Sequence, residues 1–490
     1  MKKILDRLFE GCGLPYLIHG KSDIEVTGLT TDSREVRPGF IFVALPGEQN
    51  DGRQFIQDAY SRGAVAVLMA DPPSNHPGHL TFIQAAEVTK LMAALSISFY
   101  ETAAPPLCAI GVTGTNGKTT TATILNELLK GLGHKTLFVG TTGLEIAGQY
   151  EATDYTTPPA PTLHRLIRQG LDAGISHLVM EVSSHALKLD RVFGMHFDAA
   201  IFTNLTHEHM ELHASMEDYF QTKRKLFEQL KPHGVGIVNS DDAFGRRLRE
   251  EYGFLDYGLQ GHHAQLINTR FNQEERLQVI QCTVGGRMLD CRLPMMGRHN
   301  AANALAAVTT LLALGYDEER LLPILKAIKG VPGRVEIMNM SGIRIVIDFA
   351  HTPDALEKIL EALLEIKGSA KIITVFGCPG SRDPSKRPLM GAIAARLSNR
   401  VVLTTDDIHY EEPQAIVDDI QKGIESGNYE VILDRREAIA RALDLAASGD
   451  IVLVAGRGHE RFQYVRDQKV EFEDKTVVLE EAGKLGLYTD

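Results

Sequence analysis

The residues with the clearest chemical potential form a glycine-rich loop, Gly114-Thr115-Asn116-Gly117-Lys118-Thr119-Thr120. It follows an apolar run, AIGVT, that predicts a strand, and it precedes TTATILNELLKGL, which predicts a helix. Glycines let backbone N–H groups turn toward phosphates, and a helix N-terminus adds partial positive charge. Lys118 can reach the β- and γ-phosphates, and Thr119 offers a hydroxyl to Mg²⁺. The general loop pattern has glycine where this chain has Val112, so the match is to a tighter variant that predicts an ATP or GTP site.

Length and composition limit the class of protein. The chain has 490 residues, which predicts about three domains. Acidic residues exceed basic ones, 63 to 51, and the net charge of −12 argues against a nucleic-acid binder held mainly by phosphate contacts. No apolar run approaches the ~20 residues of a membrane span. We therefore expect a globular protein with no nucleic-acid partner and no membrane span. A monomer is our expectation for its oligomeric state, although none of these features determines it.

Cysteine spacing and the N-terminus favour a cytoplasmic protein. The 5 cysteines lie far apart and none forms a Cys-x-x-Cys pair, which excludes a zinc ribbon and a redox motif. We expect reduced thiols that serve mainly in packing. Residues 1–17 begin with basic side chains, but Asp6 and Glu10 interrupt the apolar stretch. This pattern predicts an amphipathic helix instead of a signal peptide.

Composition shifts predict two domain boundaries. Pro105 and Pro106 break local structure before a new strand begins at Cys108, and a second glycine- and proline-containing join lies at 330–338. After that join, four apolar runs alternate with helical segments, at 343–350, 371–377, 400–405 and 450–456. Uniformly apolar strands that alternate with helices predict a parallel sheet covered on both faces. The sequence therefore indicates an α/β protein.

Further segments resemble one enzyme family. GTNGKTT is similar to the nucleotide loop of the Mur ligases, the ATP-dependent amide-forming enzymes of peptidoglycan assembly. The other matching segments follow the family's order and cover nearly the whole chain: TTDSREVRPGFIFVALPGEQNDG (30–52), TTPPAPTL (156–163), EVSSHALKLDRV (181–192), FTNLTHEHMELHASMEDYFQTKRKLF (202–227), GRHNAANALAA (297–307), PGRVEIM (332–338), DFAHTPDAL (348–356), FGCPGSRDPSKRPLMG (376–391) and AGRGHERFQ (455–463). Within the family, the combination resembles the MurE type.

The resemblance implies a fold of three domains. We expect a UDP-sugar-binding α/β domain over 1–104, a central P-loop ATPase domain with a parallel sheet over 105–332, and a C-terminal Rossmann-like domain that binds the amino acid over 333–490. It also implies a ligase that adds a diamino acid to UDP-N-acetylmuramoyl-L-alanyl-D-glutamate during synthesis of the peptidoglycan precursor. ATP would phosphorylate a carboxylate, and an amine would attack the acyl phosphate. Because several negative charges converge there, we expect two Mg²⁺ sites.

The resemblance further implies which residues act in catalysis. The expected catalytic residues are Lys118, Glu181, His209 and Lys223, and the expected metal-binding residues are Thr119, Glu181, His209 and Lys223. In Mur ligases the lysine that matches Lys223 is carbamylated by CO₂, which gives Mg²⁺ anionic oxygen ligands and requires a desolvated amine. Tyr219 and Lys223 share a face of a predicted helix. Spacing alone would favour a solvated lysine in the basic run that Lys223 begins.

One alternative for the metal concerns the histidines. His207, His209 and His213 could suggest zinc, whereas the resemblance implies only His209, beside a magnesium-bound phosphate. The family usually has Asp-His where this chain has Glu208-His209, which leaves the role of the acid open.

The remaining contacts expected from the resemblance fall into two groups. ATP is expected to contact the glycine-rich loop together with Asn300, Asn303, Arg334 and Asp348. The UDP-sugar-peptide is expected to contact Ser33, Thr156, Thr157, Ser183 and Arg191. Relatives often have glutamine where this chain has Leu189, so one polar contact with that substrate is expected to be missing.

The residues that would select the amino acid depart from the family's patterns. Diaminopimelate-adding relatives carry Asp-Asn-Pro-Arg and lysine-adding relatives usually carry Asp-Asn-Pro-Ala, whereas this chain has Asp406-Asp407-Ile408-His409. His409 offers a weaker, pH-dependent contact to a carboxylate than arginine would, and Asp407 favours an ammonium. The other expected amino-acid-binding residues are Arg382, Gly456 and Glu460. We therefore predict L-lysine or meso-diaminopimelate, with L-ornithine still open.

Two rival functions remain at this point. A relative that acts on another acid, such as a folate-type or poly-amino-acid ligase, would lack the N-terminal UDP-binding segment at 30–52. A P-loop ATPase that is not a ligase, or a degenerate binding subunit, would not need the expected catalytic set around Lys118 and Lys223.

Overall fold

The computed structural model describes residues 1–47, 51–73, 80–103, 106–153, 155–208, 210 and 212–488. The chain forms two compact units, each made of several stretches of sequence. The first unit comprises Met1–Gly114, Leu129–Phe202 and Phe220–Gly236, and the second comprises Thr115–Leu128, Thr203–Tyr219 and Ile237–Asp490. Among the described residues, no helix is long and apolar enough to cross a membrane.

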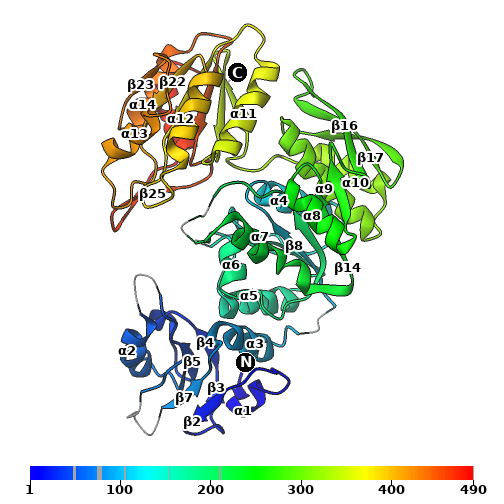
Figure 1. Cartoon of the computed structure of the whole chain (residues 1–490), viewed down its shortest axis with the longest axis vertical. Coiled ribbons are helices and arrows are strands. Elements are labelled where there is room, and N and C mark those ends of the chain that lie inside the picture. Colours follow the sequence, from blue (N-terminus) through cyan, green and yellow to red (C-terminus); the bar gives the residue numbers. More distant parts are fainter. Residues whose placement is uncertain are drawn as a thin grey trace. The chain divides into compact units, whose positions relative to one another are not determined.

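The first unit begins with a five-stranded sheet in the order β2-β7-β6-β5-β4. Its strands are β2 (Leu17–His19), β4 (Gly28–Thr30), β5 (Phe40–Val43), β6 (Ala66–Met69) and β7 (Thr81–Gln84). Alternate residues of β5 face opposite sides: Ile41 and Val43 join the core under α3 (Val88–Tyr100), and Phe42 joins the core under α2 (Ile56–Ser61). The two helices cover the two faces of this sheet (Figure 1).

The predicted N-terminal helix is much shorter than expected. The structure has β1 (Lys3–Ile4), paired with β3 (Glu25–Val26), and a single helical turn, α1 (Leu5–Leu8). Gly11 and Gly13 follow with positive φ values of 75° and 64°, a conformation that ends the helix. The prediction of a longer amphipathic helix was therefore wrong.

The first unit also holds the strands β11-β10-β9-β12-β8-β13, which are neighbours in this order within a longer sheet. The strands are β8 (Cys108–Thr113), β9 (Thr136–Gly140), β10 (Gly143–Ile146), β11 (Gln149–Glu151), β12 (His177–Glu181) and β13 (Phe197–Phe202). β9, β12, β8 and β13 are parallel and almost wholly buried. Their carboxyl ends meet at one edge, so the start of the glycine-rich loop and Glu181 lie at the same edge of the sheet. α5 (Ala160–Asp172) and α6 (Ser184–Lys188) belong to the same unit.

The second unit contains strands that follow the end of β14 (Leu230–Asn239). They are β15 (Leu255–Gly258), β16 (Ala264–Asn272), β17 (Leu277–Val284) and β18 (Arg287–Leu293). β15 pairs in parallel with β14 and β16, whereas β16, β17 and β18 form an antiparallel meander. The helices of this region are α8 (Ala243–Tyr252), α9 (Arg298–Ala313) and α10 (Glu318–Ala327).

Asp256 is a buried residue of β15 whose carboxylate accepts several hydrogen bonds. Its carboxylate accepts hydrogen bonds from the backbone N–H groups of His262 (2.9 Å) and His263 (2.8 Å), from the hydroxyl of Ser240 (2.7 Å) and from the guanidinium of Arg249 (3.1 Å). Burial by itself would raise the pKa of Asp256, but these hydrogen bonds outweigh it and hold the pKa below its usual range.

Replacing Asp256 by asparagine should lower the free energy of unfolding by about 2 kcal/mol at neutral pH, since charge-assisted hydrogen bonds are lost. Because the folded-state pKa is depressed, this stabilisation is present at neutral pH and is lost as the pH falls below about 4. Urea unfolding at pH 7 and at about pH 2.5 checks both statements. Asp290→Asn, an exposed change on β18, is the control; equal midpoints for the two variants at pH 7 would contradict the role of Asp256.

The last part of the second unit is a six-stranded sheet with the order β19-β20-β24-β21-β22-β23. Its strands are β19 (Glu336–Met340), β20 (Ile343–Asp348), β21 (Ile372–Phe376), β22 (Arg400–Leu403), β23 (Tyr429–Val431) and β24 (Ile451–Ala455). All pairs except β19–β20 are parallel, as the sequence predicts. The smaller hairpin β25 (Phe462–Val465) and β26 (Gln468–Glu471) follows β24.

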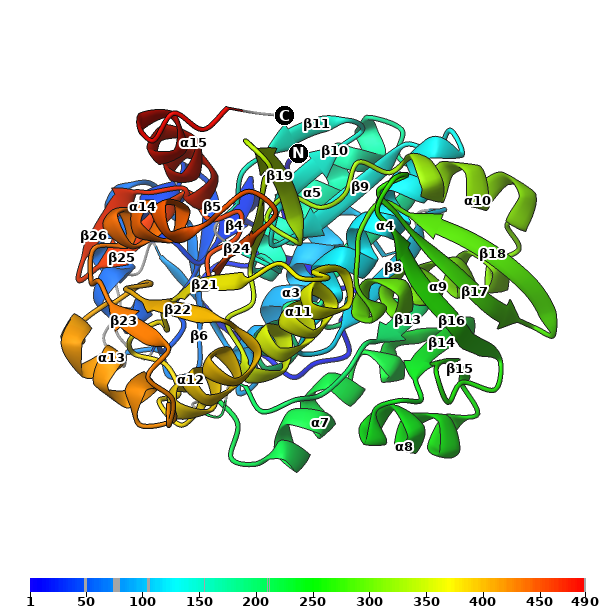
Figure 2. The ribbon, with the colours of Figure 1, turned by 90° about the horizontal axis from the view of Figure 1, so that it is seen from above.

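Helices cover both faces of this sheet (Figure 2). On one side lie α11 (Pro353–Ile366), α12 (Lys386–Leu397) and α13 (Pro413–Gln421). On the other side lie α14 (Arg435–Leu445) and α15 (Asp474–Lys484). The arrangement confirms the predicted α/β class and leaves the carboxyl ends of β20, β21, β22 and β24 together at one edge of the sheet.

Candidate functional site

The glycine-rich loop is held in place by the segment that follows β13. The backbone N–H of Thr115 donates to the carbonyl of Asn204 at 2.8 Å, and the N–H of Asn116 donates to the Asn204 side chain at 2.9 Å. The Asn204 amide and the Thr203 hydroxyl donate to the Asn116 carbonyl at 2.9 and 2.6 Å. The Lys118 ammonium lies back over the loop, 2.8 Å from the Thr115 carbonyl. The loop therefore has a fixed shape before any nucleotide arrives.

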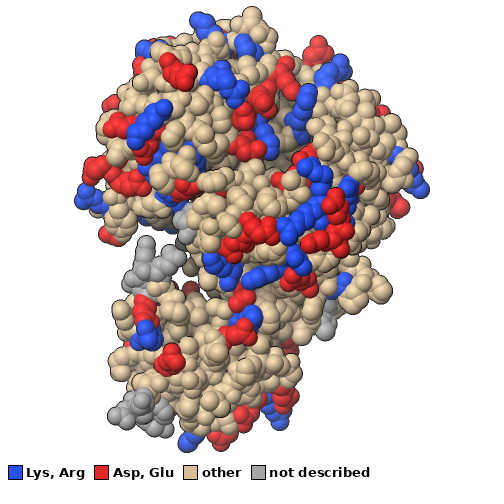
Figure 3. Space-filling model, in the orientation of Figure 1, with Lys and Arg blue, Asp and Glu red and all other residues tan. Residues whose placement is uncertain are grey.

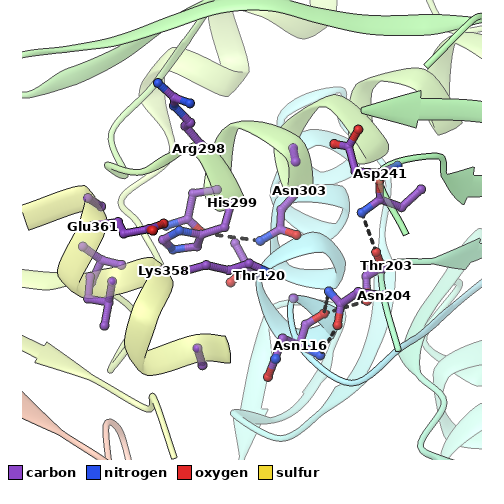
Figure 4. Close-up of a pocket in the computed structure, with 18 of the residues that line it drawn as sticks. Asn116, Thr120, Thr203, Asn204, Asp241, Arg298, His299, Asn303, Lys358 and Glu361 are labelled. Carbon is purple, nitrogen blue, oxygen red and sulfur yellow. Dashed lines mark hydrogen bonds between the residues drawn. The ribbon is translucent and has the colours of Figure 1, made fainter. Parts of the chain in front are cut away.

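A pocket of about 280 Å³ adjoins this loop (Figure 4). The loop contributes Asn116, Gly117 and Thr120, and most of the remaining wall comes from α9 and α11. Of the residues predicted to contact ATP, the following line the pocket: Asn116, Gly117, Thr120, Asn300, Asn303, Arg334 and Asp348. Figure 4 shows His299, Lys358 and Glu361 around the same pocket. Its size and position suit the base and sugar of a nucleotide whose phosphates rest on the loop.

Arg334 and Asp348 lie beside each other at the loop. The Arg334 guanidinium donates to the Thr119 hydroxyl at 3.3 Å and stacks over the Phe349 ring, 4.4 Å from its centre. The Asp348 carboxylate accepts the N–H of Val335 at 2.8 Å. Burial raises the pKa of Asp348, although the charge of Arg334 opposes this.

Gly117 makes the closest approach between the loop and α9. A Cβ at Gly117 would lie 2.6 Å from the Asn303 side-chain oxygen, and its φ is +88°. Gly117→Ala is therefore expected to raise the KM for ATP by about tenfold, since the clash and the backbone strain both deform the loop.

Gly133→Ala is the matched control for this change. Its φ is +91°, so the backbone strain is similar, but nothing lies within 4 Å of the added Cβ. We expect it to affect stability without changing the KM for ATP. Equal KM values for both variants would show that the contact with Asn303 does not matter.

Glu181 lies at the carboxyl end of β12 and is fully buried. Its carboxylate accepts the backbone N–H of Thr141 at 2.7 Å and the Thr141 hydroxyl at 3.2 Å. The Thr141 hydroxyl also lies 3.0 Å from that of Thr156. These contacts fix the orientation of a carboxylate that belongs to the same unit as the first glycine of the loop.

Lys223 is buried, with 1% of its surface exposed. It lies in α7 (Met216–Arg224), as the spacing predicts, and its ammonium donates to the Gly114 carbonyl at 2.8 Å. The alternative of a solvated lysine is therefore wrong, whereas the neighbouring Lys225 is exposed.

His209 lies outside the described residues. The acid before it, Glu208, pairs with the buried Lys386 at 3.0 Å.

Several residues predicted to contact the UDP-sugar-peptide lie together near Glu181. The Thr157 hydroxyl donates to the Glu181 carbonyl at 2.8 Å and lies 3.5 Å from the Ser183 hydroxyl. The Arg191 guanidinium donates to the Thr157 carbonyl at 2.6 Å. Ser183 also caps α6 by accepting the N–H of Ala186 at 3.1 Å. Ser33 lies apart from this cluster in sequence, in the 3₁₀ turn Ser33–Glu35 after β4, and is also buried.

A second pocket, of about 160 Å³, lies at the carboxyl edge of the last sheet. It is lined by every residue predicted to bind the amino acid: Arg382, Asp406, Asp407, His409, Gly456 and Glu460. Glu208, Lys386 and His351 also line it. Sequence segments far apart in the chain therefore meet in one pocket that carries both acidic and basic side chains.

Asp407 is not an unpaired charge in the structure, so it does not favour an ammonium as the sequence predicted. Asp407 accepts a hydrogen bond from the fully buried guanidinium of Arg457, and its carboxylate also accepts the N–H of Tyr464 at 3.1 Å. Its charge is thus already balanced within the protein. His409 has a positive φ of 48° and stacks with Tyr464, with ring centres 5.8 Å apart.

Sequence reasoning missed several residues that shape these sites. Asn204 lies inside the segment 202–227 that resembles the family, but its role depends on contacts with a loop 88 positions earlier. Thr141 follows β9, and only its position next to Glu181 reveals its function. Arg457 was read as part of a motif, while its partner Asp407 lies 50 residues away.

The surface has no single dominant sign of charge on the face drawn in Figure 3. Blue and red side chains are interspersed there over both units.

All 5 cysteines are free, and the sulfur atoms of Cys282 and Cys291 lie 4.0 Å apart.

Three protein-family models match successive parts of the chain. The Mur ligase family catalytic domain matches residues 25–95, the Mur ligase middle domain matches 112–311, and the Mur ligase glutamate ligase domain matches 333–458. This confirms the predicted three-domain α/β architecture. The exact boundaries at 104 and 332 stay predictions.

Whole-length relatives are also found. UDP-N-acetylmuramoyl-L-alanyl-D-glutamate–2,6-diaminopimelate ligases are 38% identical in Cytophaga hutchinsonii, covering 96% of this chain and 97% of the relative, and 42% identical in Chlorobaculum tepidum, covering 92% and 91%. A solved structure of a ligase with the same name is 29% identical, with a TM-score of 0.68, and covers 99% of this chain and 100% of the other. The MurF ligase from Thermotoga maritima in complex with ADP is 20% identical, with a TM-score of 0.65 over 94% of this chain and 97% of the other, and shares the fold.

Proposed function

This chain belongs to the Mur ligase family, and from that premise we propose that it joins 2,6-diaminopimelate to UDP-N-acetylmuramoyl-L-alanyl-D-glutamate at the expense of ATP. The observation that carries the proposal is the pocket of about 160 Å³, because it combines Arg382 with Asp406. A side chain that ends in both an ammonium and a carboxylate needs both charges. The near-complete coverage of relatives named for this reaction supports the same conclusion.

The reaction would proceed in two steps. The γ-phosphoryl group of ATP passes to a carboxylate oxygen of the D-glutamate residue, which forms an acyl phosphate and releases ADP. The amine of the amino acid then attacks the acyl carbon, so that a C–N bond forms, the C–O bond to phosphate breaks, and the amine loses a proton. The protein contributes positioning and charge neutralisation. Lys118 would stabilise the charge on the phosphoryl group in the first step.

Two of the residues expected to bind metal carry donor atoms that suit magnesium. Thr119 offers a hydroxyl and Glu181 a buried carboxylate, and hard oxygen donors of this kind are the ligands that Mg²⁺ prefers. The two hydrogen bonds from Thr141 orient Glu181 in advance. Bound Mg²⁺ would neutralise phosphate charge during the transfer. We retain His209 as a further contact from the sequence.

Lys223 fits the proposed carbamate. Burial disfavours a charged ammonium, and a neutral amine is the form that reacts with CO₂. The amine then forms an N–C bond to CO₂ and loses a proton, and the resulting anion offers oxygen atoms to a metal. The contact of Lys223 with the Gly114 carbonyl keeps it at the start of the loop.

The remaining assignments complete the proposal. We infer that Ser33, Thr156, Thr157, Ser183 and Arg191 hold the UDP-sugar-peptide, that Asn300, Asn303, Arg334 and Asp348 hold ATP, and that residues 1–104, 105–332 and 333–490 form the three domains. The reaction consumes ATP and a nucleotide-linked precursor, so we place it in the cytoplasm. The monomeric state stays a prediction from the sequence.

Phosphate release from ATP tests the proposed function. The purified protein is given UDP-N-acetylmuramoyl-L-alanyl-D-glutamate and, one at a time, meso-diaminopimelate, L-lysine or L-ornithine. We expect release with meso-diaminopimelate, together with a UDP-tripeptide in the mass spectrum. Release with L-lysine or L-ornithine alone would overturn the choice of amino acid, and no release with any of them would overturn the ligase proposal.

A further inference from the structure

The amino-acid pocket concentrates negative charge. One carboxylate oxygen from each of Asp406, Asp407 and Glu460 lies within 4.8 Å of the others. Asp406 and Asp407 are buried, with 4% and 9% of their surfaces exposed. Burial, and then the charge of Asp406, raise the pKa of Glu460 to about 8. A substrate carboxylate would be repelled from such a cluster unless a cation opposed it.

Arg457 is the cation placed among these acids. It is completely buried, and one terminal nitrogen of its guanidinium donates to Asp407, lies 3.5 Å from Asp406 and lies 3.8 Å from Glu460. The other terminal nitrogen donates to the Phe462 carbonyl, which fixes the side chain. Burial would lower the pKa of Arg457, but the charges of Asp406 and Asp407 outweigh it and raise the pKa, so the guanidinium stays charged.

Two other acids that line the pocket have basic side chains beside them. Glu208 pairs with Lys386 at 3.0 Å, and Asp383 lies 3.3 Å from a ring nitrogen of His207. Asp407 accepts the hydrogen bond from Arg457, whereas Asp406 lies farther from that guanidinium, at 3.5 Å, and lines the pocket together with Arg382. That pair of opposite charges matches a side chain that ends in an ammonium and a carboxylate.

We propose that Arg457 sets the amino-acid specificity by neutralising Asp407, so that the pocket accepts a zwitterionic side-chain end and disfavours a simple ammonium. This inference rests on the proposed function, and it explains how a chain with Asp407 can still use a substrate that carries a second carboxylate. Arg457 acts through Asp407 and is therefore a positioning residue.

The test compares kcat/KM for meso-diaminopimelate with kcat/KM for L-lysine in three variants. Arg457→Met leaves the charge of Asp407 unopposed, so the preference for meso-diaminopimelate should fall at least about tenfold, mainly through KM. Asp407→Asn removes the carboxylate nearest to Arg457, so the charge of Arg457 is less opposed and the preference should rise at least about fivefold. The double variant Asp407→Asn/Arg457→Met should return it to within about threefold of the unmodified protein, since neither charge remains.

The two single variants should change the preference for meso-diaminopimelate in opposite directions, which a purely structural role of Arg457 would not produce. Arg461→Met, an exposed change in the same segment, is the matched control and should leave the ratio unchanged. Loss of activity in Arg457→Met by the same factor for both amino acids, with the ratio unaltered in Asp407→Asn, would overturn the proposal. If Arg457→Met fails to fold, Asp407→Asn still decides: a higher ratio supports the proposal, and an unchanged or lower ratio overturns it. Failure of the proposed function is distinct, because the unmodified protein would then form no UDP-tripeptide.

Discussion

Replacing Lys118 by methionine is expected to slow UDP-tripeptide formation by about a thousand-fold or more. Lys118 is the cation that the loop offers to the transferring phosphoryl group, and loss of one such charge typically costs about 10³ in rate. This corresponds to about 4 kcal/mol of lost transition-state stabilisation. In the structure its ammonium lies 2.8 Å from the Thr115 carbonyl, within the loop where the phosphates would bind. Single-turnover measurement of tripeptide formation with saturating ATP checks the prediction.

The control for this variant is another lysine of the same helix. Lys130 lies in the last turn of α4 (Lys118–Gly131) and pairs with Glu145 at 2.8 Å. Lys130→Met should leave the rate within about twofold of the unmodified protein, because a partly exposed ion pair contributes little. If Lys118→Met retains more than about a tenth of the rate, the proposed role of the loop in phosphoryl transfer is wrong.

A large loss of activity is also expected when Lys223 is replaced. Lys223→Gln removes the amine that would carry the carbamate while keeping a polar side chain of similar length, and it should lower kcat by about a hundred-fold or more. The unmodified protein, equilibrated with ¹³C-labelled bicarbonate, should show a carbamate carbon signal in its ¹³C spectrum. That signal should be missing in Lys223→Gln.

Lys225→Gln is the matched control, since Lys225 is exposed and only two positions away. It should retain both the carbamate signal and the rate. A signal that persists in Lys223→Gln would assign the carbamate to another lysine. Full activity of Lys223→Gln would show that no ligand at this position is needed.

The loop and its supporting strand and helix could be predicted because they depend on local sequence. The apolar run before Gly114 forms β8, and the residues after it begin α4 at Lys118. The burial of Lys223 could not be derived from spacing, since its basic neighbours suggest solvent exposure. In the structure Lys223 is buried and donates to the Gly114 carbonyl, 109 positions away. Only the family resemblance indicated it in advance.

For the amino-acid pocket, the residues could be predicted from the sequence, but the charge that they present could not. All the residues predicted there do line it, because each follows or lies near the end of a parallel strand, and those ends meet at one edge. The charge they present could not be predicted, because it depends on which acid pairs with Arg457. Counting Asp407 as an unpaired charge therefore gave an argument for an ammonium that the structure removes. The N-terminal helix failed for a local reason, the positive φ of Gly11 and Gly13.

Isotopically labelled substrate distinguishes ligation through an acyl phosphate from other routes. UDP-N-acetylmuramoyl-L-alanyl-D-glutamate carrying ¹⁸O in the side-chain carboxylate of its glutamate is incubated with the protein, ATP and meso-diaminopimelate. We expect one labelled oxygen to leave in the inorganic phosphate while the UDP-tripeptide forms. Phosphate free of ¹⁸O would contradict the acyl phosphate, and phosphate released without any tripeptide would contradict the assignment as a ligase.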